Sequence, residues 1–188
     1  MFEFLLSFFL VILFVLALYI VWKINARQFI SSSTVASAYD SWTQDKLLER
    51  LWGEHIHLGF YDIEGGDNDF RKAKVQFVHE LVKWSGLNKL PKGSRILDVG
   101  CGIGGSARIL AKYYGYNVTG ITISPAQVKR ARELTPTELN CNFQVMDALD
   151  LKFEDGSFDG VWSVEAGAHM SDKNKFADEI LRTLRPGG

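Results

Sequence analysis

A carboxylate and a group of glycines are the residues whose types and spacing most clearly indicate chemistry. Asp98 lies two positions before Gly100, and Gly102 and Gly104 follow at alternate positions. Glycines can adopt positive φ angles and let a ligand approach the backbone closely. A carboxylate at such a turn attracts a cation and repels the pyrophosphate of a dinucleotide. The pattern therefore favours a ligand that carries positive charge and no phosphate.

The elements that must position these residues are a strand, a tight turn and the first turn of a helix. Residues 96–99 are a short apolar run, and a helix-forming segment begins directly after the glycines. The glycines at 100, 102 and 105 fit G-x-G-x-x-G, which many nucleotide-binding proteins share and which is a weak signal by itself. The alternative is an ordinary glycine-rich turn, and the combination of the acid with the glycines disfavours it.

S-adenosylmethionine (SAM) meets these requirements, because it carries an ammonium group and a sulfonium and has no phosphate. The string Leu-Asp-Val-Gly-Cys-Gly-Ile-Gly over residues 97–104 resembles motif I of the class I SAM-dependent methyltransferases. That resemblance implies a Rossmann-like α/β fold with SAM as the cofactor. It also implies that Asp98, Gly100, Gly102 and Gly104 bind it.

The second predicted strand covers residues 117–123, and a helix with Ser124 as its N-cap and Gln127 in a capping box follows it. Many nucleotide-binding units place an acid at this strand end to hold the ribose hydroxyls. Thr122 stands there instead, which resembles methyltransferases of the tocopherol, sterol and cyclopropane-forming type, where Thr with a nearby Gln replaces the acid. Thr122 and Gln127 are therefore expected to bind the cofactor. Strand-end and capping roles alone are the alternative.

The rest of the predicted domain contains two more strands, over residues 142–146 and 160–164, and a helix with an apolar stripe over 176–184. Asp147 and Ala148 close the third strand, where the resemblance implies contact with the adenine. In the usual class I order, the first strand separates the second and third from the fourth. The class has seven strands and only four can be found, so residues 91–188 are expected to be the SAM-binding half of a domain that is truncated at its C-terminal end.

The N-terminal segment predicts a transmembrane anchor over residues 1–24 and a polar linker over 25–36. Residues 4–22 carry no charge, and at about 1.5 Å per residue they could cross a bilayer core. Tyr19 and Trp22 border the segment, and Lys23 and Arg27 follow it, which predicts a cytoplasmic catalytic part. A cleavable signal peptide is the alternative, and the lack of a basic start and of a small-residue cleavage site disfavours it.

Charge and metal-ligand content exclude two classes of partner. The net charge of −1 gives no basic footprint for nucleic acid. Cys101 and Cys141 lack metal-site spacing and are interpreted as free thiols in a reducing compartment. His55 and His57 alternate, so they would face opposite ways on an extended segment, and no metal is expected.

Residues 37–90 are expected to form a helical cap, since the resemblance implies N-terminal helices that lie over the SAM pocket. A helix is predicted where apolar residues recur at helical spacing. Aromatic side chains of the cap could flank a sulfonium by cation–π contact, although core packing is their commoner use. The residues of the stripe are Phe70, Ala73, Phe77, Leu81 and Trp84.

Four further segments carry a closer resemblance, and the His-Ile-His and Glu-Ala-Gly-Ala-His parts of them narrow it. The segments are Ala-Tyr-Asp-x-Trp-Thr at 38–43, Trp-Gly-Glu-His-Ile-His-Leu-Gly at 52–59, Gly-Ile-Thr-Ile-Ser-Pro at 120–125 and Trp-Ser-Val-Glu-Ala-Gly-Ala-His-Met at 162–170. Together with motif I they closely resemble the cyanobacterial 2-methyl-6-phytylbenzoquinol and solanesylbenzoquinol methyltransferases, near relatives of γ-tocopherol methyltransferase. The resemblance implies methyl transfer from SAM to a ring carbon of a prenylated benzoquinol. It also implies contact with a lipid membrane, either the inner or the thylakoid membrane of a cyanobacterium.

Glu165 and His169 are the candidate catalytic residues, because they follow the fourth strand at the edge of the sheet where ligands bind. A ring carbon becomes nucleophilic when the neighbouring phenol loses its proton, and histidine is the natural base near neutral pH. His169 is expected to take the proton, and Glu165 to stabilise the cation or orient a hydroxyl. Hydrogen bonds that only shape the loop are the alternative for both residues.

Two other functions stay open at this stage. The first is methylation of a tocopherol or a sterol by an enzyme of the same branch. The second is a non-catalytic remnant of the SAM fold tethered to a membrane.

Overall fold

The computed structural model describes residues 2–25, 32–61 and 69–188. The chain divides into two compact units, Met1–Thr34 and Val35–Gly188. All the residues predicted from the sequence to form a functional site lie in the second unit.

The N-terminal unit contains helix α1 (Phe2–Asn25), in the region where the sequence predicts an apolar helix. Within the described parts of the chain, however, no helix combines the length and the apolar character needed to cross a membrane. The transmembrane anchor predicted for residues 1–24 is therefore not supported. Most of the linker predicted over 25–36 lies outside the described residues, and helix α2 (Ser32–Gln44) begins within it.

Four parallel strands form the sheet of the second unit, in the order β3-β2-β1-β4. This is the order that the class I resemblance predicts, and the strands start within one residue of the predicted positions. The register places Asp98 of β1 beside Gly120 of β2 and Trp162 of β4. The strands are β1 (Arg95–Val99), β2 (Asn117–Thr122), β3 (Cys141–Val145) and β4 (Gly160–Trp162).

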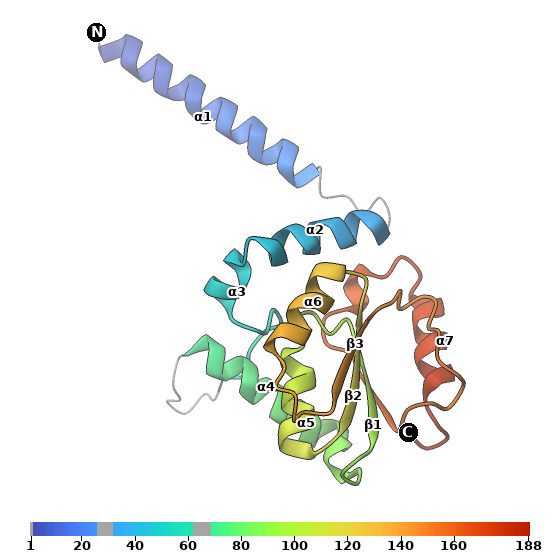
Figure 1. The fold of residues 1–188 in the computed structure, drawn as a ribbon. Coiled ribbons are helices and arrows are strands. Elements are labelled where there is room, and N and C mark those ends of the chain that lie inside the picture. The colour runs from blue at the N-terminus through green and yellow to red at the C-terminus, as the bar shows by residue number, and fades with distance from the viewer. Residues whose placement is uncertain (1, 26–31, 62–68) are drawn as a thin grey trace. The chain divides into compact units, whose positions relative to one another are not determined.

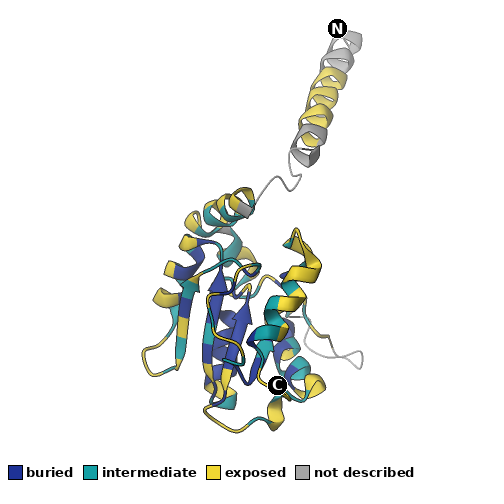
Figure 2. Cartoon of the chain, turned by 90° about the vertical axis from the view of Figure 1, so that its right-hand side faces the viewer, coloured by how far each residue is buried: buried dark blue, intermediate teal, exposed yellow. Residues whose placement is uncertain are grey.

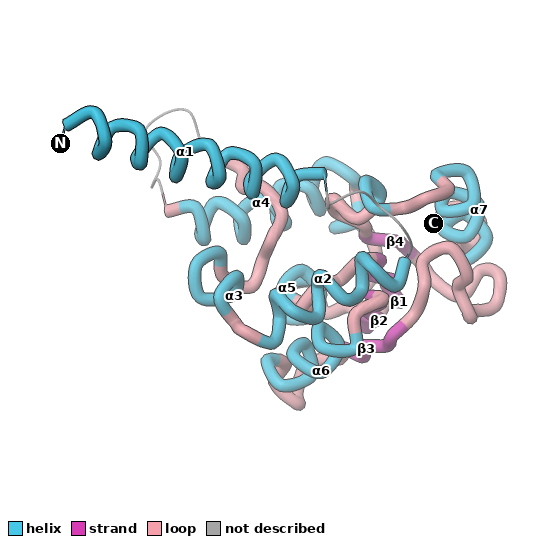
Figure 3. The backbone as a smooth tube through the Cα atoms, turned by 90° about the horizontal axis from the view of Figure 1, so that it is seen from above, coloured by secondary structure: helices cyan, strands magenta, loops and turns pink. Residues whose placement is uncertain are grey.

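Helices cover both faces of this sheet (Figure 1). Helices α4 (Phe70–Ser85), α5 (Gly105–Tyr114) and α6 (Pro125–Leu134) pack on the face that contains Ile96 and Val118. Helix α7 (Lys173–Thr183) lies on the opposite face, where Phe176 packs near Leu97 and Ile121. Figure 3 shows the strands between these two layers, and Figure 2 shows that burial is concentrated along the sheet.

Helix α4 is found where the sequence predicts it, but its buried face differs from the prediction. Ala73, Val78 and Val82 are buried, whereas Trp84 is 85% exposed. Val78 and Val82 belong to the same buried cluster as the apolar side chains of α5, and this contact selects the valine face of the helix rather than the aromatic one. The predicted stripe is therefore confirmed at Ala73, which is buried, and at Leu81, which packs against the same cluster. It is wrong at Trp84.

Short elements complete the second unit. Helix α3 (Leu47–Trp52) follows α2, and one 3-10 turn, Leu87–Lys89, precedes β1. A second 3-10 turn, Gly167–His169, lies in the loop after β4 and carries one of the candidate catalytic residues.

Candidate active site

The glycine turn between β1 and α5 is anchored on β2 and open on its other side. The N–H groups of Gly100 and Cys101 both donate to the carbonyl of Ile121, at 2.9 and 3.0 Å. Gly100, Gly102 and Gly104 all have positive φ angles, of 78°, 55° and 82°. A Cβ atom at Gly102 would meet no atom within 4 Å, so a ligand can approach the backbone there. Gly104 is the N-cap of α5 and places the N-terminus of that helix at the turn.

Asp98 presents a buried carboxylate with an unfilled hydrogen-bonding position. The residue is 3% exposed, and in the described part of the chain its Oδ2 is the one buried side-chain oxygen or nitrogen without a hydrogen-bond partner. Burial raises the pKa of Asp98 from 3.8 to about 7. An unpaired carboxylate in such a place is costly unless a donor or a cation reaches it. The ammonium group of SAM is a ligand group of that kind, so the residues present fit this cofactor.

Thr122 and Gln127 lie together at the carboxyl end of β2. The Thr122 hydroxyl donates to Oε1 of Gln127 at 2.7 Å and accepts from the N–H of Ser124 at 3.3 Å. The N–H of Gln127 donates to the Ser124 hydroxyl at 3.1 Å. Only half of the predicted capping box forms, because the Gln127 side chain contacts Thr122 instead of the Ser124 N–H. The proposed role of this pair in holding the ribose stays a prediction.

Asp147 and Ala148 follow β3 on the same side of the sheet. The N–H of Met146 donates to the carbonyl of Thr122 at 3.0 Å, which fixes the end of β3 beside that of β2. One oxygen of Asp147 accepts from the N–H of Leu149 at 2.9 Å, and Ala148 is buried. Contact between these two residues and an adenine also stays a prediction.

Glu165 and His169 lie in the loop after β4, and each contacts a different N-terminal element. Oε1 of Glu165 accepts from the N–H of Leu58 at 2.9 Å. Glu165 has a φ angle of 56°, which is uncommon and strained for a residue other than glycine. Nε2 of His169 lies 3.0 Å from the hydroxyl of Tyr39 on α2. Contacts with Leu58 and with Tyr39 of α2 therefore hold the two candidate catalytic side chains.

Tyr39 is a candidate site residue that the sequence did not reveal. Its ring contacts the ring of His169 edge to face, with the centroids 5.7 Å apart. Burial, and then the negative charge of Glu165, raise the pKa of Tyr39 above its ordinary value of 10.0. The phenol therefore keeps its proton near neutral pH and can donate it to Nε2 of His169. The signal that could have found it is its place in the Ala-Tyr-Asp-x-Trp-Thr segment at 38–43, which belongs to the family resemblance.

His55 and His57 do not face opposite ways, and that prediction is wrong. Nδ1 of His55 lies 3.1 Å from Nε2 of His57, and the ring centroids are 5.0 Å apart. The segment is irregular rather than extended, so the alternation of a strand does not apply. Burial lowers the pKa of His55 to about 3 and also lowers that of His57. In the described residues, no group of three or more His, Cys, Asp or Glu side chains could hold a metal ion.

Residues 53–60, called the strap here, lie against the start of α5. A Cβ atom at Gly105 would come within 2.6 Å of the Glu54 carbonyl and 2.8 Å of the His55 ring, so only glycine allows this contact. The Glu54 carboxylate pairs with Arg108 at 2.6 Å. The buried Lys74 donates to the carbonyls of Trp52 and His55, at 3.0 and 2.8 Å. The strap is thus fixed beside the glycine turn at several points.

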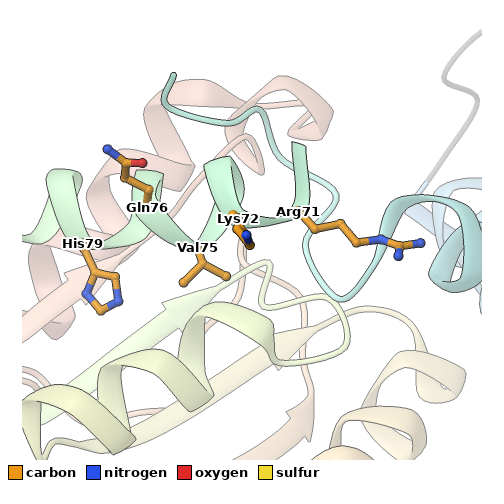
Figure 4. Close-up of a pocket in the computed structure, with 5 residues that line it drawn as sticks. All are labelled: Arg71, Lys72, Val75, Gln76 and His79. Carbon is orange, nitrogen blue, oxygen red and sulfur yellow. The ribbon is translucent and has the colours of Figure 1, made fainter. Parts of the chain in front are cut away.

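A surface cavity of about 420 Å³ lies along α4, apart from these residues (Figure 4). The side chains of Val75 and His79 point from α4 toward the neighbouring helix, and Nδ1 of His79 lies 2.8 Å from the Tyr114 hydroxyl of α5. None of the residues predicted for the site lines this cavity. Its lining residues are Arg71, Lys72, Val75, Gln76 and His79.

The strand order, the glycine turn and the acid inside β1 define the Rossmann-like fold of the SAM-dependent methyltransferases. Residues 97–188 match the family model described as a methyltransferase domain. The resemblance to the class that the sequence predicts is confirmed.

Two curated proteins support the narrower resemblance. The chain is 60% identical over 165 residues to 2-methyl-6-phytyl-1,4-hydroquinone methyltransferase from Synechocystis sp.. The aligned residues are 88% of this chain and 52% of that protein. It is 44% identical over 152 residues to the chloroplastic tocopherol O-methyltransferase of Arabidopsis thaliana. These aligned residues are 76% of this chain and 44% of that protein. The chain thus spans about half the length of the curated relatives it matches.

A solved structure gives the same result for the fold. It is a phosphoethanolamine N-methyltransferase from Haemonchus contortus, in complex with phosphomonomethylethanolamine and S-adenosylhomocysteine. The TM-score is 0.60 at 30% identity, over 79% of this chain and 31% of that chain.

Proposed function

We propose that this chain is part of a SAM-dependent methyltransferase that methylates a ring carbon of a prenylated benzoquinol. The observation that carries the proposal is the buried, unpartnered Oδ2 of Asp98 next to an open glycine turn. The similarity to a hydroquinone methyltransferase supports the substrate class. The S-adenosylhomocysteine bound to the related N-methyltransferase supports the cofactor.

When bound, SAM would supply an electrophilic methyl group on its sulfonium. Asp98 would hold the positively charged end of the cofactor, and the glycine turn would let the cofactor approach the backbone. Thr122 and Gln127 would bind the ribose hydroxyls. Asp147 and Ala148 would bound the adenine.

The Tyr39–His169 pair would remove the proton that activates the acceptor. The quinol hydroxyl gives its proton to the Tyr39 oxygen, and the Tyr39 proton passes to Nε2 of His169 over the 3.0 Å contact. The resulting phenolate makes the adjacent ring carbon nucleophilic. That carbon would accept the methyl group that bound SAM supplies, and the electron pair of the carbon–sulfur bond would leave with S-adenosylhomocysteine. Loss of the ring hydrogen as a proton to solvent water would then restore the aromatic ring, and His169 would return its proton to the phenolate.

Glu165 would orient the acceptor from the other side of the loop. One of its oxygens accepts from the Leu58 N–H, which ties the strap to the loop after β4. Its other oxygen would accept from the second hydroxyl of the quinol. Glu165 and the Tyr39–His169 pair would then each bind one of the two hydroxyls of the quinol.

A tocopherol is the second candidate acceptor, and the similarity to a tocopherol O-methyltransferase favours it. It also carries a phenol for the Tyr39–His169 pair, but its second oxygen is closed into a ring and cannot donate to Glu165. The whole protein can be incubated with SAM and either 2-methyl-6-phytyl-1,4-hydroquinone or γ-tocopherol, with the products analysed by mass spectrometry. Methylation of the hydroquinone alone supports the first proposal, and methylation of the tocopherol alone replaces it with the second.

A further inference from the structure

The end of β2 lacks the acid that many nucleotide-binding folds place there, but a carboxylate reaches the same region from α2. Oδ1 of Asp40 accepts from the Ser124 hydroxyl at 2.5 Å and from the Ala126 N–H at 3.0 Å. Ser124 is fully buried and is the N-cap of α6. One oxygen of Asp40 thus binds both the capping side chain and the first turn of α6, across 84 residues of sequence.

This contact completes the N-terminus of α6. Pro125 occupies the first helical position and has no N–H to satisfy. The N–H of Ala126 donates to Asp40, and the N–H of Gln127 donates to the Ser124 hydroxyl. A carboxylate is also favoured by the positive end of the helix dipole. Asp40 therefore supplies an anionic acceptor that Ser124 alone could not provide.

The same contact fixes the pair expected to hold the ribose. Because the Ser124 hydroxyl donates its hydrogen bond to Asp40, its lone pairs are free to accept from the N–H of Gln127. Gln127 in turn accepts from Thr122, and the Ser124 N–H donates back to Thr122. The hydrogen bonds run without a gap from Asp40 through Ser124 to Gln127 and Thr122.

We propose that Asp40 is a positioning residue for the cofactor, which supplies from α2 the carboxylate that the end of β2 lacks and thereby orders the ribose end of the site. This inference rests on the proposed function, because it takes SAM as the ligand. It assigns to Asp40 an effect on binding of the cofactor and not on the proton transfer. The preceding residue, Tyr39, is assigned to the proton transfer and not to binding of the cofactor, since it contacts His169.

The test compares Asp40→Ala and Asp40→Asn with Asp45→Asn as a control at the residue that directly follows the same helix. Asp45 is exposed and belongs to none of the contacts that carry the proposal. Calorimetry on the whole protein gives the Kd of S-adenosylhomocysteine and of its 2′-deoxyribose analogue. We expect Asp40→Ala to weaken binding of S-adenosylhomocysteine by about tenfold, as for loss of a charge-assisted contact, with Asp40→Asn intermediate and Asp45→Asn unchanged.

The ribose analogue separates positioning from a general loss of structure. The unaltered protein should bind S-adenosylhomocysteine more tightly than the 2′-deoxy analogue, and Asp40→Ala should lose most of that preference. Unchanged affinity in Asp40→Ala, or an equal loss for both ligands, would overturn the inference. Failure of the unaltered protein to bind S-adenosylhomocysteine at all would instead refute the proposed function.

Discussion

The buried carboxylate of Asp98 predicts that ligand-free stability and cofactor affinity respond to pH in opposite directions. Asp98 has a pKa of about 7 in the folded protein, against an ordinary value of 3.8, because burial disfavours its charged form. The folded state therefore binds more protons than the unfolded state between these values. The contribution of Asp98 to stability is fully present below pH 3.8 and is lost as the pH rises through 7.

The magnitude follows from the size of the shift. A difference of about three pKa units corresponds to about 4 kcal/mol at most between a neutral and an ionised Asp98. Asp98→Asn keeps the size of the side chain and removes the charge, but its amide must still be buried. We expect this change to raise the free energy of unfolding of the ligand-free protein at pH 8 by at least ~1 kcal/mol.

Cofactor binding should show the reverse dependence. A cationic ligand prefers the ionised carboxylate. As the pH rises toward 7, the Kd of SAM should therefore fall by about tenfold per pH unit, and above pH 7 it should be constant. In Asp98→Asn this dependence should disappear, and binding at pH 8 should be at least about tenfold weaker.

Urea unfolding and calorimetry between pH 5.5 and 8 measure both effects, with the exposed carboxylate change Asp178→Asn as the control. The control should leave the unfolding free energy and the Kd of SAM unchanged. A Kd of SAM that does not vary with pH in the unaltered protein would refute the reasoning. So would an Asp98→Asn protein that is less stable than the unaltered protein at pH 8.

Three further changes test other parts of the structure. Tyr39→Phe removes the hydroxyl that contacts His169, and we expect kcat to fall about 100-fold in steady-state assays while the Kd of S-adenosylhomocysteine stays the same; an unchanged kcat would exclude the proton relay. Lys74→Met removes the hydrogen bonds to Trp52 and to His55 of the strap, and urea unfolding should show a loss of ~1–3 kcal/mol; an unaltered midpoint would show that Lys74 does not hold the strap. Burial lowers the pKa of His55 to about 3, so the folded state favours its neutral form and the free energy of unfolding should fall as the pH drops below 6.5. His55→Gln should reduce that acid sensitivity, and an identical pH profile of the two proteins would contradict the lowered pKa of His55.

The strands and the glycine turn could be predicted from the sequence because their signals are local. Each strand is a short run with turn residues on both sides, and the glycines at 100, 102 and 104 need positive φ angles that few other residues adopt. The parallel order then followed from the class that motif I indicates. The capping helix at Ser124 was predicted for the same reason, since its cap and its proline are adjacent in the sequence.

The contacts that hold the site together could not be predicted, because they join residues far apart in the chain. Tyr39 and His169 are separated by 130 positions, and Leu58 and Glu165 by 107. Nothing in the local pattern of α4 shows that α5 selects the valine face. The path of the strap was predicted wrongly for a related reason. The side chains of Lys74 and Glu165 fix it through hydrogen bonds to backbone groups of the strap, and such contacts leave no periodic pattern in the sequence.

Transfer of a labelled methyl group from SAM to 2-methyl-6-phytyl-1,4-hydroquinone by the whole protein tests the central claim most directly. The account predicts a product with one additional ring methyl group, formed together with S-adenosylhomocysteine in equal amount. It also predicts that Asp98→Asn and Tyr39→Phe both reduce the rate, the first through the KM for SAM and the second through kcat. No labelled quinol at saturating SAM, from protein that binds S-adenosylhomocysteine, would contradict the assignment of this acceptor.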